Sequence, residues 1–256
     1  HIGFTASEER RGQKLLRSLG IPQGAKWVCL IVRDSAYLKA AAPGQNFSYH
    51  DHRDSDISSY AHAAVELVRK GYYVIRMGKV VERQMPVRHT RIIDYPFYKQ
   101  QSDFGQLYLG AKCEFCFGAS TGFMAIPQVF GRPTVVVNFV PLEYISTWCK
   151  GLVIWKHHVK DGKRMTLAEI INCGAGQFLF AHQFKNAGIT LEDNSAQEIT
   201  DAVLEMVEWV EGGLKTRLQL RFWSIFPIKS ISPYNGKCLH GFPRVRIGKQ
   251  FIKAYL

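Results

Sequence analysis

Two arginines and one run of small residues are the side chains in this sequence best suited to hold a phosphate. Arg33 and Arg76 each end or follow a short apolar run, and Gly118-Ala-Ser-Thr-Gly122 follows a third run. An arginine offers a planar fork of N–H donors that matches a phosphate group. The start of a helix offers free backbone N–H groups to an anion, and Ser120 and Thr121 add hydroxyls. Together these residues predict a diphosphate site without a metal ion.

An ordinary structural explanation fits the same residues. Arg33 has Asp34 and Asp56 within reach along the chain, and Gly118 and Gly122 are typical of tight turns. The sequence leaves both explanations open. It contains neither G-x-G-x-x-G nor G-x-x-x-x-G-K-[ST], so a dinucleotide site or a P-loop has little support.

The segment Ser48-Tyr-His-Asp-His-Arg-Asp-Ser-Asp56 is dense in ionisable groups. His50, Asp51 and His52 are candidates for general acid–base catalysis. The alternation of two histidines around an acid could also indicate a metal site. No further ligand is evident in the sequence, so we expect no metal ion. The third alternative is a solvated loop held by structural ion pairs. We expect no cofactor.

These residues need elements that bring them together. Fully apolar runs predict strands, and amphipathic or capped stretches predict helices. The strands are expected at 27–32, 72–77, 91–95, 113–117, 134–139 and 151–155, and the helices at 56–70, 102–111, 121–130, after Thr166 and after Ser195. The alternation predicts an α/β fold with a Rossmann-like, doubly wound parallel sheet. Ligands bind at the carboxyl ends of such strands, where Arg33, Arg76 and residues 118–122 all fall.

The cysteines and one histidine pair are interpreted as structural. Cys113 and Cys116 have a C-x-x-C spacing, but residues three apart on a strand face opposite sides. Buried free thiols in a reducing cytoplasm are therefore expected. His157 and His158 follow a strand and are interpreted as surface or packing residues rather than a site.

Charge separates the last part of the chain from the rest. The chain has 256 residues and a formal net charge of +12, and residues 214–256 contain nine Lys or Arg and no acid. We expect residues 1–212 to form the nucleotide-binding domain and 213–256 a basic extension. The extension either packs back on the domain or contacts an anionic membrane or acceptor. No apolar run approaches the roughly 20 residues of a membrane span, and no motif of nucleic-acid recognition is present.

Several motifs occur in an order that resembles a family of bacterial glycosyltransferases of surface-polysaccharide biosynthesis. They are "VRDSAYL" (32–38), "YHDHRDSD" (49–56), "GYYVIRMG" (71–78), "IIDYP" (92–96) and "SDFGQLYLGAKCEFCFGASTG" (102–122). The resemblance covers roughly residues 3–210. A more distant similarity is to fucosyltransferases that use GDP-fucose, which have the GT-B architecture of two Rossmann-like domains.

The resemblance implies roles for individual residues. Arg33 matches the arginine that holds the donor phosphates, Ser102 and Asp103 match a Ser-Asp pair near the donor, and Ser120-Thr121-Gly122 matches the phosphate turn. Ile31 stands where the fucosyltransferase motif has histidine, and Asp34 stands where it has a second arginine. This departure argues against a GDP-fucose donor. The resemblance also implies an acceptor-binding domain upstream of residue 1.

We therefore expect a cytoplasmic glycosyltransferase. Its basic extension would contact the inner face of the membrane peripherally. It would move a sugar from a nucleoside-diphosphate sugar to a hydroxyl of a glycan or lipid-linked acceptor in the synthesis of cell-surface polysaccharide or glycolipid. The alternative is a non-catalytic module that binds a nucleotide or carbohydrate. The interpretation as a nucleic-acid-binding protein would rest on the positive charge alone, so we expect no nucleic-acid partner.

Overall fold

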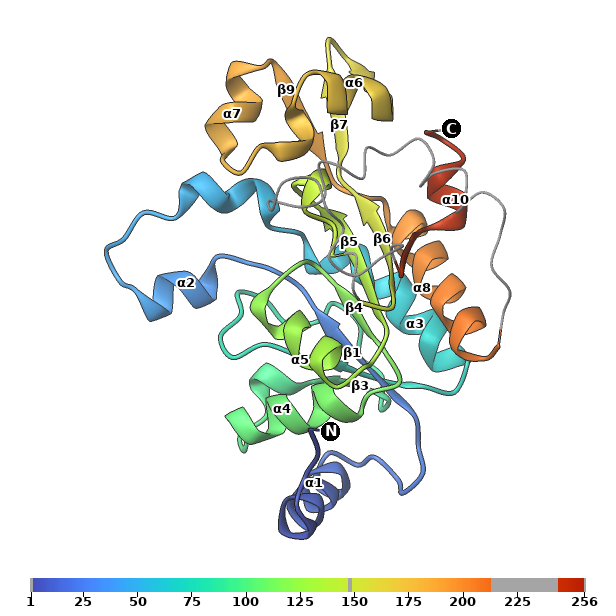
Figure 1. Cartoon of the computed structure of the whole chain (residues 1–256). Helices are drawn as coiled ribbons and strands as arrows, with labels where there is room; N and C mark the ends of the chain where they lie inside the picture. Colours follow the sequence, from blue (N-terminus) through green and yellow to red (C-terminus); the bar gives the residue numbers. More distant parts are fainter. Residues whose placement is uncertain (1, 147–148, 213–243, 256) are drawn as a thin grey trace.

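The computed structural model describes residues 2–146, 149–212 and 244–255 (Figure 1). Within these residues, the main sheet has seven strands, all parallel to their neighbours, in the order β10-β6-β5-β4-β1-β2-β3. Their bounds are β1 (Trp27–Ile31), β2 (Tyr73–Arg76), β3 (Ile92–Asp94), β4 (Cys116–Gly118), β5 (Thr134–Phe139), β6 (Gly151–Trp155) and β10 (Val245–Ile247).

The strand order fixes where a ligand is expected. Successive strands run outward from β1 to β3, and the chain then crosses back to place β4 on the other side of β1. The point where the order reverses therefore lies between β1 and β4, as in the 3-2-1-4-5-6 order of nucleotide-binding sheets. The predicted α/β class with a Rossmann-like parallel sheet is confirmed. A strand occurs at each predicted place before residue 156, but β4 begins at Cys116 rather than at 113, and Cys113 lies at the end of α4 instead of on the strand.

Helices cover both faces of this sheet (Figure 1). α3 and α8 pack together on one face, and α1, α4 and α5 lie on the other. The helices are α1 (Ala6–Ser18), α2 (Ala36–Ala41), α3 (Ala61–Arg69), α4 (Asp103–Lys112), α5 (Ala125–Val129), α6 (Leu167–Asn172), α7 (Ala181–Asn186), α8 (Ala196–Val210) and α10 (Lys249–Ile252). Short 3-10 turns are η1 (Ser48–Arg53), η2 (Ile57–Tyr60), η3 (Tyr95–Phe97), η4 (Gly122–Met124), η5 (Leu142–Tyr144) and η6 (Ala175–Gln177).

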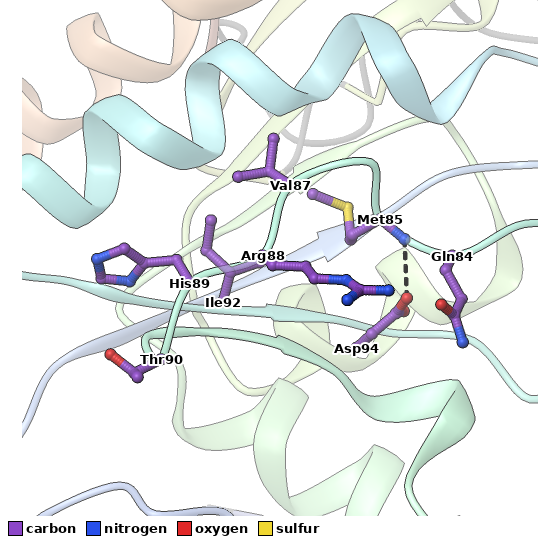
Figure 2. A pocket seen from close by; sticks show the side chains of 8 residues that line it. All are labelled: Gln84, Met85, Val87, Arg88, His89, Thr90, Ile92 and Asp94. Atoms are coloured by element: carbon purple, nitrogen blue, oxygen red, sulfur yellow. Dashed lines mark hydrogen bonds between the residues drawn. The ribbon is translucent and has the colours of Figure 1, made fainter.

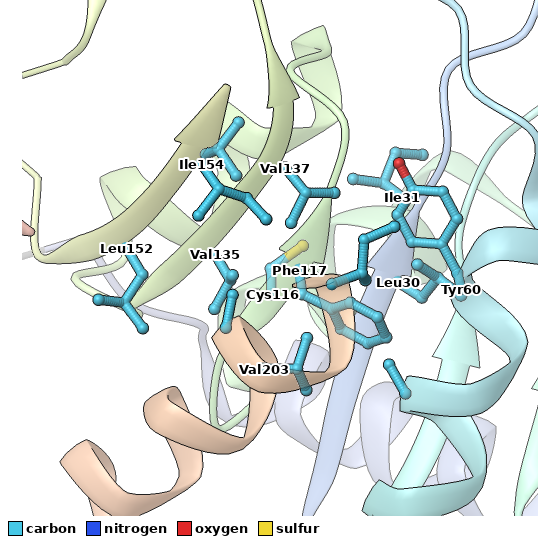
Figure 3. Close-up of a cluster of buried hydrophobic side chains, with 14 of the residues drawn as sticks. Leu30, Ile31, Tyr60, Cys116, Phe117, Val135, Val137, Leu152, Ile154 and Val203 are labelled. Carbon is cyan, nitrogen blue, oxygen red and sulfur yellow. The ribbon is translucent and has the colours of Figure 1, made fainter. Parts of the chain in front are cut away.

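The core fills both faces of the sheet, and one half of it lies between the sheet and α3 and α8. Figure 3 shows Val203 of α8 facing Val135 and Leu152 of the central strands, with Tyr60 at the strand ends. All four side chains are fully buried. The uninterrupted apolar character of the strands follows from this packing, because helices cover both of their faces.

Capping residues set the helix starts where the sequence predicts them. Ser102 accepts a hydrogen bond from the backbone N–H of Gly105, and Thr166 and Ser195 each form a complete capping box with the glutamate three residues later. Each such cap is worth about 1 kcal/mol. The caps hold α4 and α8 at fixed positions beside the strand ends.

A second, smaller sheet was not anticipated from the sequence. It is antiparallel and contains β8 (Lys163–Arg164), β7 (His157–Lys160) and β9 (Ile189–Glu192). His157 and His158 begin β7 and are both fully buried. The interpretation of these histidines as packing residues is consistent with that burial. The strands are short and polar, so they carry little hydrophobic periodicity.

Residues 244–255 return to the main sheet. β10 pairs with β6, and α10 packs against α8. The predicted basic extension therefore has one described part, while residues 213–243 lie outside the described residues. The boundary at residue 212 and the membrane contact stay predictions. In the described part of the chain, no helix is both long and apolar enough to cross a membrane.

Buried polar bonds hold the returning segment. His157 Nδ1 lies 2.7 Å from the Tyr255 hydroxyl, and His157 Nε2 lies 3.0 Å from a carboxylate oxygen of Glu198. Burial raises the pKa of Glu198, but hydrogen bonds from His157 and from the Ser195 backbone outweigh it and lower that pKa from 4.5 to about 2. The ionised form of Glu198 is therefore the form that the fold favours.

This contact between Glu198 and His157 predicts a loss of stability in acid. Because the folded-state pKa of Glu198 is depressed, its contribution is complete above about pH 4.5 and is lost as the pH falls toward 2. We expect Glu198→Gln to lower the free energy of unfolding at pH 7 by about 1.5–3 kcal/mol and to flatten its decline between pH 5 and 3. Denaturant melts over that range measure it. An unchanged pH slope in the variant would contradict the assignment.

Candidate functional site

A pocket of about 520 Å³ opens at the point where the strand order reverses. We call it the switch-point pocket. It is lined from β1 and the residues after it, from the segment after β2, from the first turns of α4, and from η4 after β4. The lining residues are Ile31, Val32, Arg33, Asp34, Tyr37, Leu38, Gly78, Lys79, Asp103, Gln106, Thr121, Gly122 and Phe123. Of the residues predicted from the sequence, the pocket brings together Arg33, Asp103, Thr121 and Gly122.

Arg33 is held in place by a chain of polar contacts. Its Nε donates to Asp54 Oδ1 at 3.2 Å. The carbonyl of Asp54 accepts from the Nζ of Lys156, which is almost fully buried at the end of β6 and pairs with Asp193 at 2.7 Å. Arg33 therefore pairs with Asp54 rather than with Asp34 or Asp56. Its two terminal nitrogens form no hydrogen bond with the described residues and remain free for a ligand.

Arg53 is a second cation that the sequence analysis did not single out. Its side chain is half-buried and has no hydrogen bond or ion pair within the described residues. Burial, and then the neighbouring charge of Arg33, lower the pKa of Arg53. The charges of Arg33 and Arg53 therefore repel each other, and the charge of Asp54 partly compensates. Such a pair is stabilised by an anionic ligand.

The small-residue run places an unbonded hydroxyl in the switch-point pocket. Thr121 Oγ1 is buried and has no hydrogen-bond partner in the part of the chain that the structure describes. An unsatisfied buried hydroxyl costs about 1–3 kcal/mol, and a bound oxygen would recover that cost. Ser120, by contrast, does not line the pocket.

The helix expected after this run is shorter than predicted. Residues 122–129 form the single 3-10 turn η4 followed by the five-residue helix α5. The Thr121 side chain does not cap it. Gly131, with φ +70°, ends the helix two residues after Val129, and Pro133 follows.

The two glycines of the run have different roles. Gly118 has φ +140°, and a Cβ there would lie 1.8 Å from the backbone oxygen of Ile31, its register partner on β1. Gly118 is therefore required for the close approach of β4 to β1. A Cβ at Gly122 would meet nothing within 4 Å. Gly122 is therefore not needed for the turn, and it leaves open space in the pocket.

The opposite wall of the switch-point pocket carries an exposed ion pair. Lys79 Nζ lies 2.9 Å from Asp103 Oδ1, and this pairing raises the pKa of Lys79. Gln106 fixes the wall, because its amide donates to the Gly78 carbonyl at 2.7 Å. A carboxylate beside a mobile cation offers both an acceptor and a donor to a polar ligand.

Two other predicted residues lie outside the pocket. The Arg76 guanidinium is buried and donates to Asp94 at 3.1 Å and to the Arg83 carbonyl at 2.9 Å. It lies 3.8 Å from Asp34, so it supports one wall of the pocket from behind. Ser102 caps α4 and does not line the pocket. Direct ligand contacts of Arg76 and Ser102 stay predictions, and neither residue lines the pocket.

The acid–base candidates form a separate group around η1. His50 lies beside Tyr49 and Phe180, and His52 lies beside Phe184. Burial, and then the charges of Arg53 and Lys156, lower the pKa of His52 to about 4.

Asp51, between the two histidines, is exposed. It lines a further hollow of about 400 Å³, which we call the loop pocket. None of the three candidates lines the switch-point pocket.

A third hollow, of about 500 Å³, lies beside the edge strand β3 (Figure 2). Its lining includes Arg88, His89 and Asp94, but Asp94 already accepts from the Met85 N–H at 2.8 Å and from Arg76. The one carboxylate of this hollow is thus engaged within the protein. Among the described residues, no group of three or more His, Cys, Asp or Glu is placed to hold a metal ion.

No protein-family model matches the sequence, and no curated protein matches it. Three solved structures overlap with it in part. A glycosyl transferase family 9 protein from Veillonella parvula is 14% identical, covers 80% of this chain and 54% of its own, and gives a TM-score of 0.49. The E. coli ADP-heptose LPS heptosyltransferase II is 12% identical, covers 55% and 40%, and gives 0.37.

The third structure is the E. coli heptosyltransferase WaaC with ADP, which is 13% identical, covers 73% of this chain and 58% of its own, and gives a TM-score of 0.31. The chain thus spans about half the length of the solved structures that it matches. All three TM-scores lie below 0.5, so these structures do not indicate the function of this chain.

Proposed function

We propose that this chain binds a nucleoside-diphosphate sugar in the switch-point pocket and is the donor-binding part of a glycosyltransferase. The observation that carries the proposal is that Arg33, with its free terminal nitrogens, and the unbonded Thr121 hydroxyl line one pocket at the reversal of the strand order. Arg53 lies outside the lining, and its charge acts on Arg33. These groups are cationic or hydrogen-bonding, and they lie where parallel sheets bind nucleotides.

The diphosphate fits the cationic side of the pocket. The terminal nitrogens of Arg33 form charge-assisted bonds to the phosphate oxygens, and Arg53 adds a second positive charge nearby. The Thr121 hydroxyl lines the same pocket and donates to a phosphate oxygen. Because Asp54 already holds Arg33, this side chain requires little ordering when the ligand binds.

The nucleoside fits the other side of the pocket. The Asp103 carboxylate accepts from ribose hydroxyls, as acidic residues do in other nucleotide-binding sheets. Tyr37, whose side chain is 51% exposed, and Phe123 offer aromatic faces on which any base can stack. This wall supports a nucleoside of either purine or pyrimidine type.

The reaction transfers the sugar to a hydroxyl. The acceptor oxygen forms a bond to the anomeric carbon, the bond from that carbon to the phosphate oxygen breaks, and its electron pair leaves on the diphosphate. The two arginines stabilise the leaving diphosphate electrostatically. The acceptor proton passes to a base from the 48–54 segment. Asp51 is the best placed of the three candidates, because its carboxylate is exposed and unpaired among the described residues, whereas the two histidine rings lie against aromatic side chains.

A variant of Asp51 tests its role. We expect Asp51→Asn to lower the rate of sugar transfer by about 10²–10⁴-fold while nucleoside-diphosphate affinity changes by less than twofold. Asn keeps the size of the side chain and removes only its basicity. His52→Ala is the comparison variant. Wild-type turnover in Asp51→Asn combined with a loss in His52→Ala would transfer the role to His52.

A non-catalytic nucleotide-binding module is the second candidate, because no acid–base candidate lines the switch-point pocket. Release of nucleoside diphosphate from a panel of nucleotide sugars, with and without glycoside acceptors, separates the two. A transferase releases it faster with an acceptor present. Tight binding without release from any donor would identify the module.

The broader biology is proposed on the same basis. The acceptor would be a glycan or lipid-linked sugar of cell-surface polysaccharide or glycolipid synthesis, and the basic extension would approach an anionic membrane from the cytoplasmic side. Each basic residue near such a surface contributes about 1 kcal/mol. Co-sedimentation with anionic but not neutral vesicles is the expected result for the membrane contact.

A further inference from the structure

The loop pocket lies beside the switch-point pocket and differs from it in chemistry. It is enclosed by α2 and by the segment from Gln45 to Asp54, within the long connection between β1 and η2. The two pockets share Leu38, and Asp54 of the loop pocket binds Arg33 of the switch-point pocket. The two pockets are therefore adjacent, and the Arg33–Asp54 ion pair links their linings.

The lining of the loop pocket is rich in unused hydrogen-bonding groups. The Ser35 hydroxyl makes no capping bond to α2. The side chains of Gln45, Ser48 and Asp51 form no hydrogen bond or ion pair with the other described residues. Hydroxyls, an amide and a carboxylate thus face one hollow of about 400 Å³, a volume that suits a small ligand.

The lining of the loop pocket carries no excess of positive charge. Asp51 and Lys39 have opposite charges, and Asp54 is paired with Arg33. Carboxylates accept hydrogen bonds from hydroxyl groups but repel a phosphate. The apolar side chain of Phe47, also in the lining, offers a ring face. The site therefore suits a neutral molecule that carries several hydroxyls, in contrast to the cationic switch-point pocket.

We propose that the loop pocket is the subsite for the acceptor, and that it binds a neutral sugar ring through its hydroxyls. This inference rests on the proposed function. Gln45, Ser35 and Ser48 orient the ring, and Asp51 accepts the proton from the hydroxyl that is to be glycosylated. The two pockets meet at Leu38, so the acceptor hydroxyl would reach the anomeric carbon of the donor sugar at their common border.

The test compares two substitutions that differ in position but not in chemistry. Gln45→Ala removes an amide from the pocket lining, and Gln100→Ala removes an exposed amide after η3, outside every pocket described above. Each variant is titrated calorimetrically with nucleoside diphosphates and assayed for transfer to methyl glycosides as acceptors. We expect Gln45→Ala to raise the KM for the glycoside about tenfold, with nucleoside-diphosphate affinity within twofold of wild type. Gln100→Ala should change neither quantity.

Two results would overturn the inference. A rise in the KM for the nucleotide sugar with an unchanged KM for the glycoside would assign the loop pocket to the donor sugar. Equal KM values in both variants would leave the loop pocket without a role in substrate binding. If the wild-type protein binds no nucleoside diphosphate in the calorimetric titration, the proposed function itself is wrong. That result is distinct from a change in the KM for the glycoside. Ser48→Ala is the second variant should Gln45→Ala fold poorly.

Discussion

Arg33→Ala is expected to weaken nucleoside-diphosphate binding by about ten- to a hundredfold. The side chain supplies the free guanidinium nitrogens of the switch-point pocket, and a hydrogen bond to a charged group contributes roughly 1.5–3 kcal/mol. The affinity of wild type and variant should be measured calorimetrically at the same salt concentration. Because one cation is lost from the site, the affinity of the variant should also depend less steeply on salt.

The control for Arg33→Ala is Arg69→Ala. Arg69 pairs with Glu66 on the surface of α3, and its side chain is 69% exposed. Surface ion pairs contribute only about 0–1 kcal/mol to stability, and this one is remote from the pocket lining. Arg33→Ala should lower the melting temperature slightly, because Asp54 loses its partner. Equal nucleotide affinities in the two variants would remove Arg33 from the site.

The second large effect separates the two glycines of the 118–122 run. Gly118→Ala places a Cβ 1.8 Å from the Ile31 carbonyl oxygen, a clash of backbone with side chain that only movement of β4 can relieve. We expect it to lower the free energy of unfolding by more than about 3 kcal/mol, a large share of the usual 5–15 kcal/mol. Gly20→Ala is the control, since it has φ +71° but meets nothing within 4 Å. It should cost only about 1–2 kcal/mol.

Gly122→Val should show the opposite pattern. A side chain there fills open space in the pocket without meeting the fold. We expect unfolding free energy within about 1 kcal/mol of wild type and a loss of nucleotide affinity of tenfold or more. Denaturant melts and calorimetry on the same preparations give both quantities. Wild-type affinity in a folded Gly122→Val protein would show that no ligand approaches this turn.

The sequence was informative wherever hydrophobic pattern and local capping decide the structure. The runs at 27–32 and 134–139 could be assigned to strands because both faces of a parallel strand are buried. Ser102, Thr166 and Ser195 could be assigned as caps because their bonds involve residues only three positions away. Arg33 and residues 118–122 could be placed at one edge of the sheet because carboxyl ends of parallel strands coincide.

What the sequence did not reveal depends on contacts between distant residues. Arg76 ends one strand and Arg33 follows another. Asp94 binds the guanidinium of Arg76, whereas Asp54 binds only the Nε of Arg33 and leaves its terminal nitrogens free. The sequence does not show that Arg53 lacks a partner, because Asp54 stands next to it. In the structure, Asp54 is bound to Arg33 instead. The loop pocket arises from a 3-10 turn and the short helix α2, neither of which has a strong periodic pattern. His50 and His52 meet aromatic rings more than a hundred residues away in the chain.

The central claim is that the switch-point pocket binds a nucleoside diphosphate. Titration of the wild-type protein with ADP, GDP, UDP and CMP, followed by calorimetry and by thermal melts, tests it most directly. A ligand at a hundredfold excess over its Kd stabilises the protein by about 2.7 kcal/mol, which a melt resolves. We expect at least one nucleoside diphosphate to bind below millimolar concentration and Arg33→Ala to weaken this binding. Absence of binding heat and of any melting shift with all four nucleotides at millimolar concentration would contradict it.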